Sequence, residues 1–536
     1  MLRSKPSSSG APGLVPPRPL RRAAGAAIGA AVALLIGLVL WAIATTAATD
    51  PATAPSRIDV PWLLLTTFTQ ASLTTILSLL VGTALAWSLD RLRFPGRDLI
   101  VGLFASAIVT PGIIVAFGLL AVWGRAGWVA QLTGLQFPIF GLGGILFAHV
   151  LLDGAFAARI LLARLDSIPA FRLKTGQSLG LSATQRFALI DWPAIRPTLP
   201  GLGAIIFLLA FTSFPVVLLL GGGPANQTLE VAIYSAVRLD FDLRGAVLLA
   251  LVQIAVCAGI ILLAAAAAPI PAHLGRSAGQ RWQDSPMVRL VQAAVLGLCI
   301  LGFALPLLAI LVDGLGAGLG DLMRQPAFWR SLWTSLGLAS ISALLTLLVG
   351  LTLAAARAAS PSRRLKTALA APAYAYLAVP AVVLALGFFL LARNAGLDPA
   401  LAAPAVVVIA NTLLALPYAV STLGPPLEAI ALRRGKLIRA LGLTSRQQAL
   451  AVEWPLIAGD AGVVTALAFC FSLGDLGVIA LFGTQDFATL PLLMSRALGA
   501  YRSNDAAAIA AIMLLLTLAA FVLIPKLFEK LGHARA

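Results

Sequence analysis

Charged side chains are scarce in this sequence. Asp, Glu, Lys and Arg make up 11% of its 536 residues, whereas hydrophobic residues make up 60%. In a typical soluble protein about a quarter of the residues are charged. The composition therefore excludes an ordinary soluble enzyme, and it predicts an all-α polytopic membrane protein whose helices cross the bilayer many times.

Residues that hold metals or nucleotides in a characteristic spacing are also missing. The three cysteines, Cys257, Cys299 and Cys470, lie in apolar runs and provide neither a disulfide framework nor a metal site. The Gly-Lys pair at 435–436 lacks the other residues of a phosphate-binding loop. No segment is long enough for a soluble ATPase domain. We therefore expect no metal, no cofactor, no nucleic-acid partner and no ATP hydrolysis by this chain.

Long apolar runs are abundant. A spanning helix needs about 20 predominantly apolar residues, and twelve segments fulfil this condition. The fourth and the tenth are interrupted by Gly or Pro. The predicted spans are 23–47, 63–88, 99–123, 139–162, 198–220, 245–268, 287–312, 331–356, 367–392, 401–422, 461–483 and 506–526.

A short polar motif occurs twice, each time between the fourth and fifth span of a group of six. Residues 179–193 read LGLSATQRFALIDWP, and residues 441–455 read LGLTSRQQALAVEWP. Such a repeat indicates internal duplication. Each copy predicts a helix, a turn at the glycine, a second helix and a stop before the proline.

The duplication predicts two homologous six-helix halves. A basic, disordered tail covers 1–22, because five Lys and Arg residues occur there without an acid. The first half covers 23–268 with its polar loop at 165–197. A linker follows at 269–286, and the second half covers 287–536 with its polar loop at 427–459.

The distribution of charge predicts the orientation. If the N-terminus is cytoplasmic, nearly all of the net charge of +17 falls on cytoplasmic segments, including both polar loops. The outward loops together are close to neutral. Because Lys and Arg are retained on the cytoplasmic side, we expect both termini and both loops in the cytoplasm.

The spacing within the two loops resembles the cytoplasmic coupling loop of bacterial ABC importer permeases. That family has Gly, nine residues, Ile, one residue and Leu-Pro, preceded by Glu-Ala-Ala. The Glu-Ala-Ala part is absent, since Lys174 and Lys436 begin the corresponding triplets, and Trp replaces the Leu. The matching positions, with their neighbouring leucines, are Gly180, Leu181, Ile190 and Pro193, and Gly442, Leu443, Val452 and Pro455.

Further stretches narrow the resemblance. They include FAHVLLD at 147–153, LLLGGGP at 218–224 and SLGDLGVIALFG at 472–483. With the fused six-plus-six layout, they are similar to the thiamine and thiamine pyrophosphate importer permeases of proteobacteria. Fused ferric iron importer permeases have the same architecture and remain an alternative. An ion-driven secondary transporter and a lipid-handling scaffold explain the spans but not the repeated loop.

The resemblance implies a type I ABC importer permease in the bacterial inner membrane. Its expected partners are two copies of an ATPase subunit, one beneath each coupling loop, and a periplasmic substrate-binding protein. ATP hydrolysis would belong to the ATPase, and transport would proceed by alternating access of the two halves.

Two carboxylates within spans are candidates for the substrate pathway. Asp153 and Asp475 would normally face protein or a water-filled cavity, because a carboxylate at the bilayer centre is costly. They either attract a cationic substrate or make structural hydrogen bonds, for example from Asp153 to His149. Gln70, Gln253 and Asn411 either line a path or hydrogen-bond to neighbouring helices.

Overall fold

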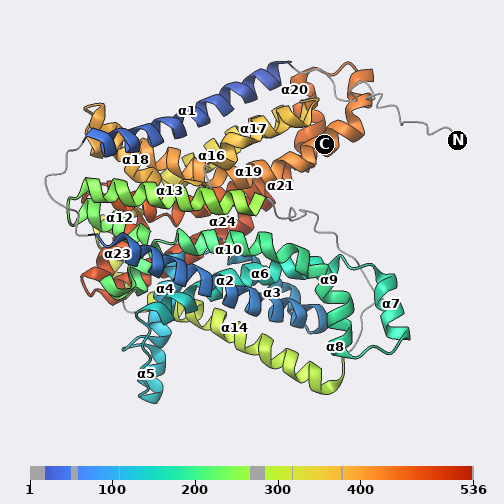
Figure 1. The fold of residues 1–536 in the computed structure, drawn as a ribbon, viewed down its shortest axis with the longest axis horizontal. Helices are drawn as coiled ribbons and strands as arrows, with labels where there is room; N and C mark the ends of the chain where they lie inside the picture. Colours follow the sequence, from blue (N-terminus) through green and yellow to red (C-terminus); the bar gives the residue numbers. More distant parts are fainter. Residues whose placement is uncertain are drawn as a thin grey trace.

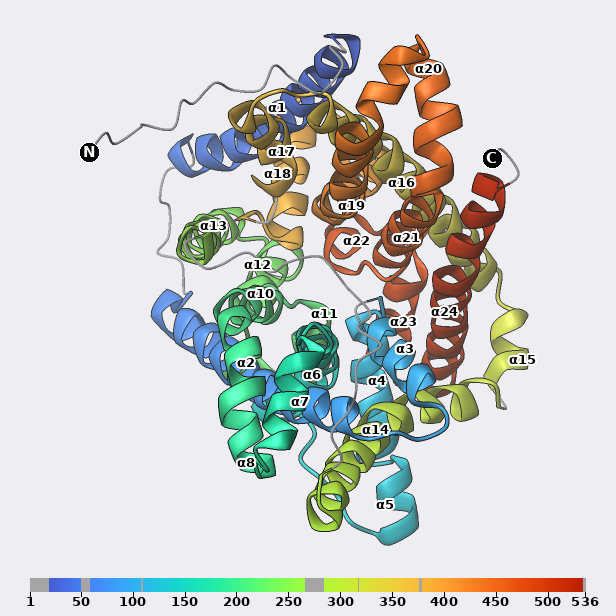
Figure 2. The ribbon, with the colours of Figure 1, turned by 90° about the vertical axis from the view of Figure 1, so that its right-hand side faces the viewer.

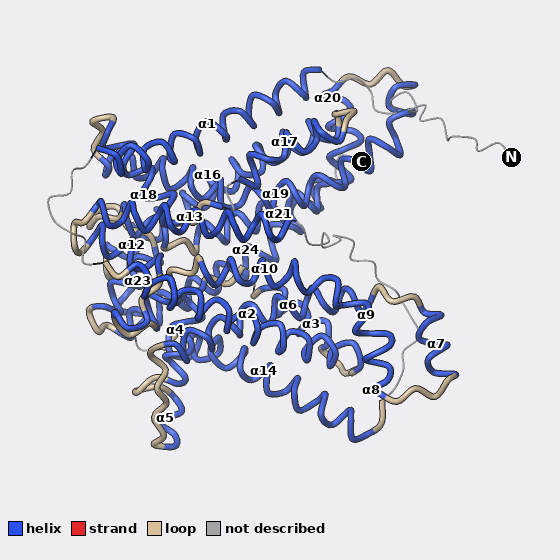
Figure 3. The backbone as a smooth tube through the Cα atoms, in the orientation of Figure 1, coloured by secondary structure: helices blue, strands red, loops and turns tan. Residues whose placement is uncertain are grey.

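The computed structural model describes residues 19–49, 58–107, 109–265, 284–316, 318–375 and 378–533. Within these residues every regular element is helical (Figure 3). Eleven helical segments are long and apolar enough to span a membrane, and the shorter apolar helix Ala381–Asn394 lies in the ninth predicted span. The predicted all-α polytopic membrane fold is confirmed. Residues 1–18 of the expected tail and 269–283 of the expected linker lie outside the described residues. The last residues of the expected disordered tail, 19–22, are instead helical and begin the first span.

The helices before the linker include six that form the spans or their main parts. The elements are α1 (Pro19–Thr49), α2 (Val60–Arg91), α3 (Arg97–Ser106), α4 (Gly112–Trp123), α5 (Trp128–Thr133), α6 (Leu142–Asp166), α7 (Ala170–Ser178), α8 (Ala183–Arg186), α9 (Trp192–Ile195), α10 (Leu199–Phe211), α11 (Pro215–Leu220), α12 (Leu229–Arg238) and α13 (Leu243–Ala265).

The long helices after the linker follow the same order, with α14 in the place of α1, whereas some of the short helices differ. The elements are α14 (Pro286–Gly314), α15 (Gly318–Met323), α16 (Pro326–Ala358), α17 (Arg363–Ala375), α18 (Ala381–Asn394), α19 (Pro399–Ala440), α20 (Ser445–Gln447), α21 (Trp454–Leu473), α22 (Gly477–Phe482), α23 (Leu490–Gly499) and α24 (Ser503–His533).

The sequence predicted that the fourth and tenth spans are interrupted, but the helix breaks lie in other spans. The fourth and tenth spans are the unbroken helices α6 and α19, although α19 contains Pro404, Pro417, Pro425 and Pro426. Membrane helices tolerate proline where neighbouring helices satisfy the freed backbone groups. The third and ninth spans are instead divided into α3 and α4 and into α17 and α18, and the fifth and eleventh break before α11 and α22.

The first helix of each group packs against the other group. Helix α1 lies along α16, α17 and α18, and α14 lies along α2 and α4 (Figure 2). Matching glycines permit both close approaches. A Cβ at Gly118 of α4 would lie 2.9 Å from Ile310 of α14, and one at Gly387 of α18 would overlap Val39 of α1. Small residues let membrane helices approach closely and gain packing energy, so these crossings fasten the two groups together.

The two polar loops lie at one end of the molecule and α12 and α23 lie at the other (Figure 1). Matching hydroxyls hold α12 and α23 in place. Thr67 Oγ1 accepts a 3.1 Å hydrogen bond from the Leu229 N–H, and Ser335 Oγ accepts one of 2.8 Å from the Leu490 N–H. Each bond satisfies an otherwise unpaired amide at a helix start. The two ends of the molecule therefore repeat the same local construction.

Candidate functional site

The two polar loops have the same backbone. The φ angle of Gly180 is +64° and that of Gly442 is +60°, so both lie in the left-handed region that strains a residue with a side chain. Around each glycine the helix closes with a Schellman motif. The Leu181 N–H donates to the Gly176 carbonyl at 3.2 Å, and the Leu443 N–H donates to the Ile438 carbonyl at 3.2 Å. The turn predicted at each glycine is present.

A capping box starts the second helix of each loop. Ser182 Oγ accepts from the Gln185 N–H, and the Gln185 side chain accepts from the Ser182 N–H. Thr444 and Gln447 make the same reciprocal pair. Because both amides at the helix start are satisfied within four residues, each loop has a defined shape of its own.

The predicted stop before each proline is wrong. The chain stays helical through a π-helical turn, Phe187–Asp191 in the first loop and Gln448–Glu453 in the second, and then enters α9 or α21. Pro193 and Pro455 each occupy the first turn of the helix that follows, where the missing N–H costs no intrahelical bond. Each polar loop is therefore continuous with the span behind it.

The loop residues divide into exposed and buried ones. Lys174 and Lys436 are exposed, Leu181 and Leu443 are partly buried, and Ile190 is buried. Val452, Pro193 and Pro455 are partly buried. Within each copy of the motif, the leucine that precedes the glycine is the most exposed large hydrophobic side chain, at 72% for Leu179 and 62% for Leu441. The glycine turn thus presents an apolar side chain to the surroundings at both loops.

A buried ionic network holds the first loop. Asp191 forms an ion pair with Arg91, at the end of α2, and both side chains are almost completely buried. Arg91 Nε also lies 3.9 Å from Asp284 Oδ2, which precedes α14. Arg186, in the loop itself, lies 3.7 Å from Asp90. The network ties the loop to α2 and to the start of α14.

A different cation holds the matching acid of the second loop. Glu453 stands where the first loop has Asp191, and its Oε1 accepts a 2.7 Å hydrogen bond from Arg21 of α1. Arg21 also donates to the Ser445 carbonyl at 3.0 Å, and Gln448 donates to Glu453 at 2.7 Å. The recurring acid was visible in the sequence, but its arginine partners were not, since they come from non-equivalent helices.

Asp153 does not bond to His149, so that sequence-based alternative is wrong. His149 Nδ1 lies 3.2 Å from Gln70 Nε2 on α2 and 2.9 Å from the Ile145 carbonyl in its own helix. Residues four apart on a helix are neighbours, but the ring is engaged with α2 instead. Asp153 is buried on α6, and its Oδ2 has no hydrogen-bond partner in the described part of the chain.

Asp475 lies in the break between α21 and α22. Its Oδ1 accepts a 3.3 Å hydrogen bond from the Val478 N–H, and its Oδ2 is buried with no hydrogen-bond partner among the described residues. A Cβ at the adjacent Gly474 would overlap Pro111, which precedes α4. The flanking glycines predicted a loosened helix here, and the helix is interrupted at this point.

The other broken spans meet at the same place. A Cβ at Gly477, the first residue of α22, would lie 3.3 Å from Ala381 Cβ, the first residue of α18. A Cβ at Gly112, the first residue of α4, would lie 3.0 Å from Val216 of α11. Pro111 and Pro380 directly precede α4 and α18, and these prolines were the signal in the sequence for the two unpredicted breaks.

The remaining polar residues within spans bond to their neighbours. Gln253 donates to Glu230 at 2.9 Å, and Asn411 donates to Ser472 at 2.9 Å. Asn411 and His149 are separated in the sequence by the same number of residues as the two repeated loops, so they occupy equivalent positions in the two halves. Each of them makes a polar contact with a neighbouring helix. These bonds agree with the structural alternative for these residues.

Comparison with known proteins identifies the family. No family model matches the chain. The chain is 38% identical over 472 residues to the thiamine transport system permease protein ThiP of Salmonella typhimurium, which covers 86% of this chain and 88% of that protein. It is 38% identical over 462 residues to ThiP of Brucella melitensis, with 84% and 85% covered, and 37% identical over 472 residues to ThiP of Escherichia coli, with 86% and 88% covered. The chain therefore belongs to the family of thiamine transport system permease proteins.

Proposed function

We propose that this chain is the permease subunit of an ATP-driven importer that moves thiamine or thiamine pyrophosphate from the periplasm to the cytoplasm. The observation that carries the proposal is the identity of 37–38% to permeases of thiamine transport over 84–86% of the chain. It favours thiamine over ferric iron. The duplicated loop favours an ATP-driven importer over an ion-driven transporter.

The loops are the proposed docking sites for two ATPase subunits. Each offers an exposed leucine on a turn that is fixed by its own hydrogen bonds, and an exposed lysine on the helix that precedes the turn. Preorganised apolar contacts of this kind favour association because little conformational freedom is lost on binding. One ATPase subunit beneath each loop gives the expected pair, which supplies the ATP hydrolysis.

We propose that motion passes from the ATPase to the pore through two ion pairs, Arg91–Asp191 and Arg21–Glu453. When ATP closes the ATPase dimer, the loops approach each other. The first loop pulls on α2 and α14 through Arg91 and Asp191, and the second pulls on α1 through Glu453 and Arg21. Because α1 and α14 each pack on the opposite group, movement of either loop acts on both groups. Alternating access follows from this rocking.

The meeting point of the broken helices is the proposed substrate pathway. Interrupted spans leave backbone groups unpaired, and such backbone is tolerated at membrane depth where it lines a cavity or is covered by protein. Asp475 lies there with one carboxylate oxygen free of hydrogen bonds among the described residues. Thiamine carries a fixed positive charge, so Asp475 is the first candidate to attract it, and Asp153 is the second.

The proposed orientation places both termini and both loops in the cytoplasm of a bacterium, with the permease in its inner membrane. The charge distribution supports this orientation. The end that carries α12 and α23 then faces the periplasm, where a substrate-binding protein would deliver the ligand.

Reconstitution tests the proposal. The permease is placed in liposomes with its ATPase subunit and a thiamine-loaded binding protein, and uptake of radiolabelled thiamine is measured. We expect uptake that requires ATP and the binding protein and that stops with an ATPase variant unable to hydrolyse ATP. Uptake of ferric iron in place of thiamine would refute the substrate. Uptake that follows an ion gradient without ATP would refute the importer class.

A further inference from the structure

Two arginines, one before the linker and one after it, converge on the same turn. Arg238 is in the last turn of α12, and its Nη2 donates a 3.1 Å hydrogen bond to the Gly483 carbonyl. Arg496 is on α23, and its Nη1 donates a 3.0 Å hydrogen bond to the Thr484 carbonyl. Because Gly483 and Thr484 are adjacent in the chain, with Cα atoms about 3.8 Å apart, the two guanidinium groups lie close to each other.

No acid balances these two charges in the described part of the chain. Arginines in the neighbouring loops do form ion pairs with aspartates, namely Arg324 with Asp321, Arg330 with Asp486 and Arg502 with Asp505. Burial lowers the pKa of Arg496, the charge of Arg238 lowers that pKa further, and Tyr234 raises it. Two like charges that are held together without an acid produce a positive potential, which attracts an anion.

The hydrogen bonds to the turn leave most of the donors of both arginines available. A guanidinium group has five N–H donors, and among the described residues one donor of each arginine bonds to the turn. Arg238 is exposed and Arg496 is partly buried, so the remaining donors can reach a ligand. Planar guanidinium groups match the oxygen atoms of phosphate and bind them through paired hydrogen bonds. The pair therefore fits a phosphate or diphosphate group.

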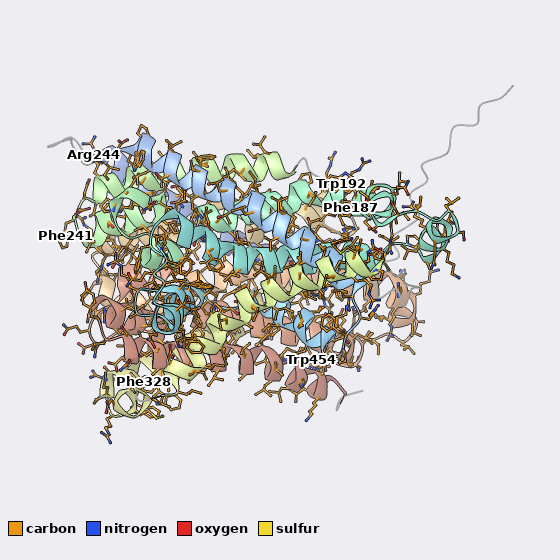
Figure 4. The ribbon with its side chains drawn as sticks, turned by 90° about the horizontal axis from the view of Figure 1, so that it is seen from below. Phe187, Trp192, Phe241, Arg244, Phe328 and Trp454 are labelled. Carbon is orange, nitrogen blue, oxygen red and sulfur yellow. The ribbon has the colours of Figure 1, made fainter. Side chains whose placement is uncertain are left out.

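The arginine pair lies inside the bundle at the end opposite to the coupling loops. In the view along the bundle, α12 lies inward of α13, and α23 lies inward of α24 (Figure 2). Arg238 ends α12, and Figure 4 shows Phe241 of the following corner at the opposite end of the molecule from Phe187 and Trp192 of the first loop. Lipid headgroups surround the perimeter of a membrane protein, whereas a ligand that enters between the halves passes this inner position.

Helix α22 connects the arginine pair to Asp475. It begins at Gly477, just after the break that contains Asp475, and it ends at Phe482, just before the turn. Its 6 residues extend about 9 Å. A carboxylate therefore lies before one end of this helix, and two guanidinium groups lie at the other end. Thiamine pyrophosphate has the complementary charges, because a short chain joins its positive ring to a negative diphosphate.

We propose that Arg238 and Arg496 form a phosphoanion site at the outer mouth of the pathway, which binds the diphosphate of thiamine pyrophosphate. This inference rests on the proposed function, and it names the residues that distinguish the phosphorylated ligand from free thiamine. Free thiamine is a cation, so the pair repels it. The diphosphate makes the ligand a net anion, which the pair attracts.

The first test compares the uptake of radiolabelled thiamine pyrophosphate with that of thiamine in liposomes that contain the permease–ATPase complex and the binding protein. In Arg238→Gln and in Arg496→Gln, the ratio of pyrophosphate uptake to thiamine uptake should fall at least about tenfold, because a charge-assisted bond is lost. Arg496→Lys keeps the charge and should retain part of the ratio. Arg393→Gln is the matched control, since Arg393 is exposed in the last turn of α18 at the same end (Figure 1), and it should leave the ratio unchanged.

The second test measures the binding of inorganic pyrophosphate to the full permease chain in lipid-free detergent micelles by calorimetry. The wild type should bind it, and each glutamine variant should bind it at least about tenfold more weakly. Wild-type binding in both variants would overturn the inference. An equal loss of both uptakes would also overturn it, because the arginines would then only hold the turn.

Liposomes with and without anionic lipid separate the ligand from a lipid headgroup, whose phosphate has the same chemistry. An effect of the variants that occurs only with anionic lipid would assign the pair to the headgroups and overturn the inference. Wild-type import of thiamine without import of its pyrophosphate would overturn the inference alone. If the wild type imports neither ligand, the proposed function itself fails.

Discussion

Replacement of Gly180 by valine isolates the role of the coupling-loop turn. The φ of Gly180 is +64°, and a Cβ built there meets no atom within 4 Å. A side chain at this position is therefore opposed only by the backbone conformation and not by a collision. Gly180→Val should insert normally but should bind the ATPase subunit weakly and transport poorly.

The magnitude follows from the left-handed backbone. A residue with a Cβ pays about 1–2 kcal/mol in this conformation, and a β-branched residue lies at the upper end. The strain is released when the loop leaves its folded turn. The docking conformation then becomes roughly 5- to 30-fold less favoured relative to other loop conformations. Asparagine tolerates the left-handed region, so Gly180→Asn should retain most of the association.

The assay measures ATPase-subunit binding and thiamine uptake in reconstituted liposomes. Gly96→Val is the matched control, because Gly96 also has a positive φ of +86°, has no atom within 4 Å of a built Cβ, and lies outside the coupling loops. It should carry the same backbone strain without loss of ATPase binding. Gly442→Val should behave as Gly180→Val does.

Two results would refute this reasoning. Wild-type uptake in the Gly180→Val, Gly442→Val double variant would remove the loops from the coupling mechanism. Equal loss in Gly180→Asn and Gly180→Val would show that the side chain interferes with the ATPase surface directly, and that the conformation of the turn is not the cause.

Three further predictions concern the anchors, the pathway and the orientation. Arg91→Gln leaves Asp191 buried without its main partner and should destabilise the protein by about 3–5 kcal/mol, measured as a lower melting temperature. Arg21→Gln removes a more exposed ion pair and should destabilise the protein less. Equal losses of stability in the two variants would contradict the difference in burial. Asp475→Asn should reduce uptake of thiamine more than Asp153→Asn, with both proteins inserted at normal levels, and undiminished uptake in Asp475→Asn would leave that residue a structural role. Reporter fusions after residues 180 and 442 should report cytoplasm and those after 235 and 500 periplasm, and a periplasmic signal from either coupling loop would overturn the orientation.

The sequence by itself determined the class of protein and the duplication. Scarce charge and long apolar runs require a polytopic helical membrane protein, because these are properties of composition and length alone. The repeated spacing around Gly180 and Gly442 predicted two equal turns, because a left-handed turn is a local property of a few residues. The positive φ at both glycines confirms this prediction.

The tertiary structure decided which residues meet. In a membrane span all faces are apolar, so the sequence contains little information on the neighbour against which a helix packs. Only the fold places α1 on α18 and α14 on α4, and with them Arg21 on Glu453. The same holds for His149, which contacts Gln70 from another helix instead of Asp153 one turn away.

The positions of the helix breaks also depended on the fold, and two aromatic residues with a left-handed backbone were found only in the structure. Proline interrupts the chain before α4 and α18 but not within α19, since the cost of a missing hydrogen bond depends on which neighbours can replace it. Phe241 and Tyr501 carry no turn signal of their own. Their positive φ goes with local hydrogen bonds, from the Asp242 N–H to the Ala236 carbonyl and from the Arg502 N–H to the Ala497 carbonyl, at positions where glycine is the usual residue.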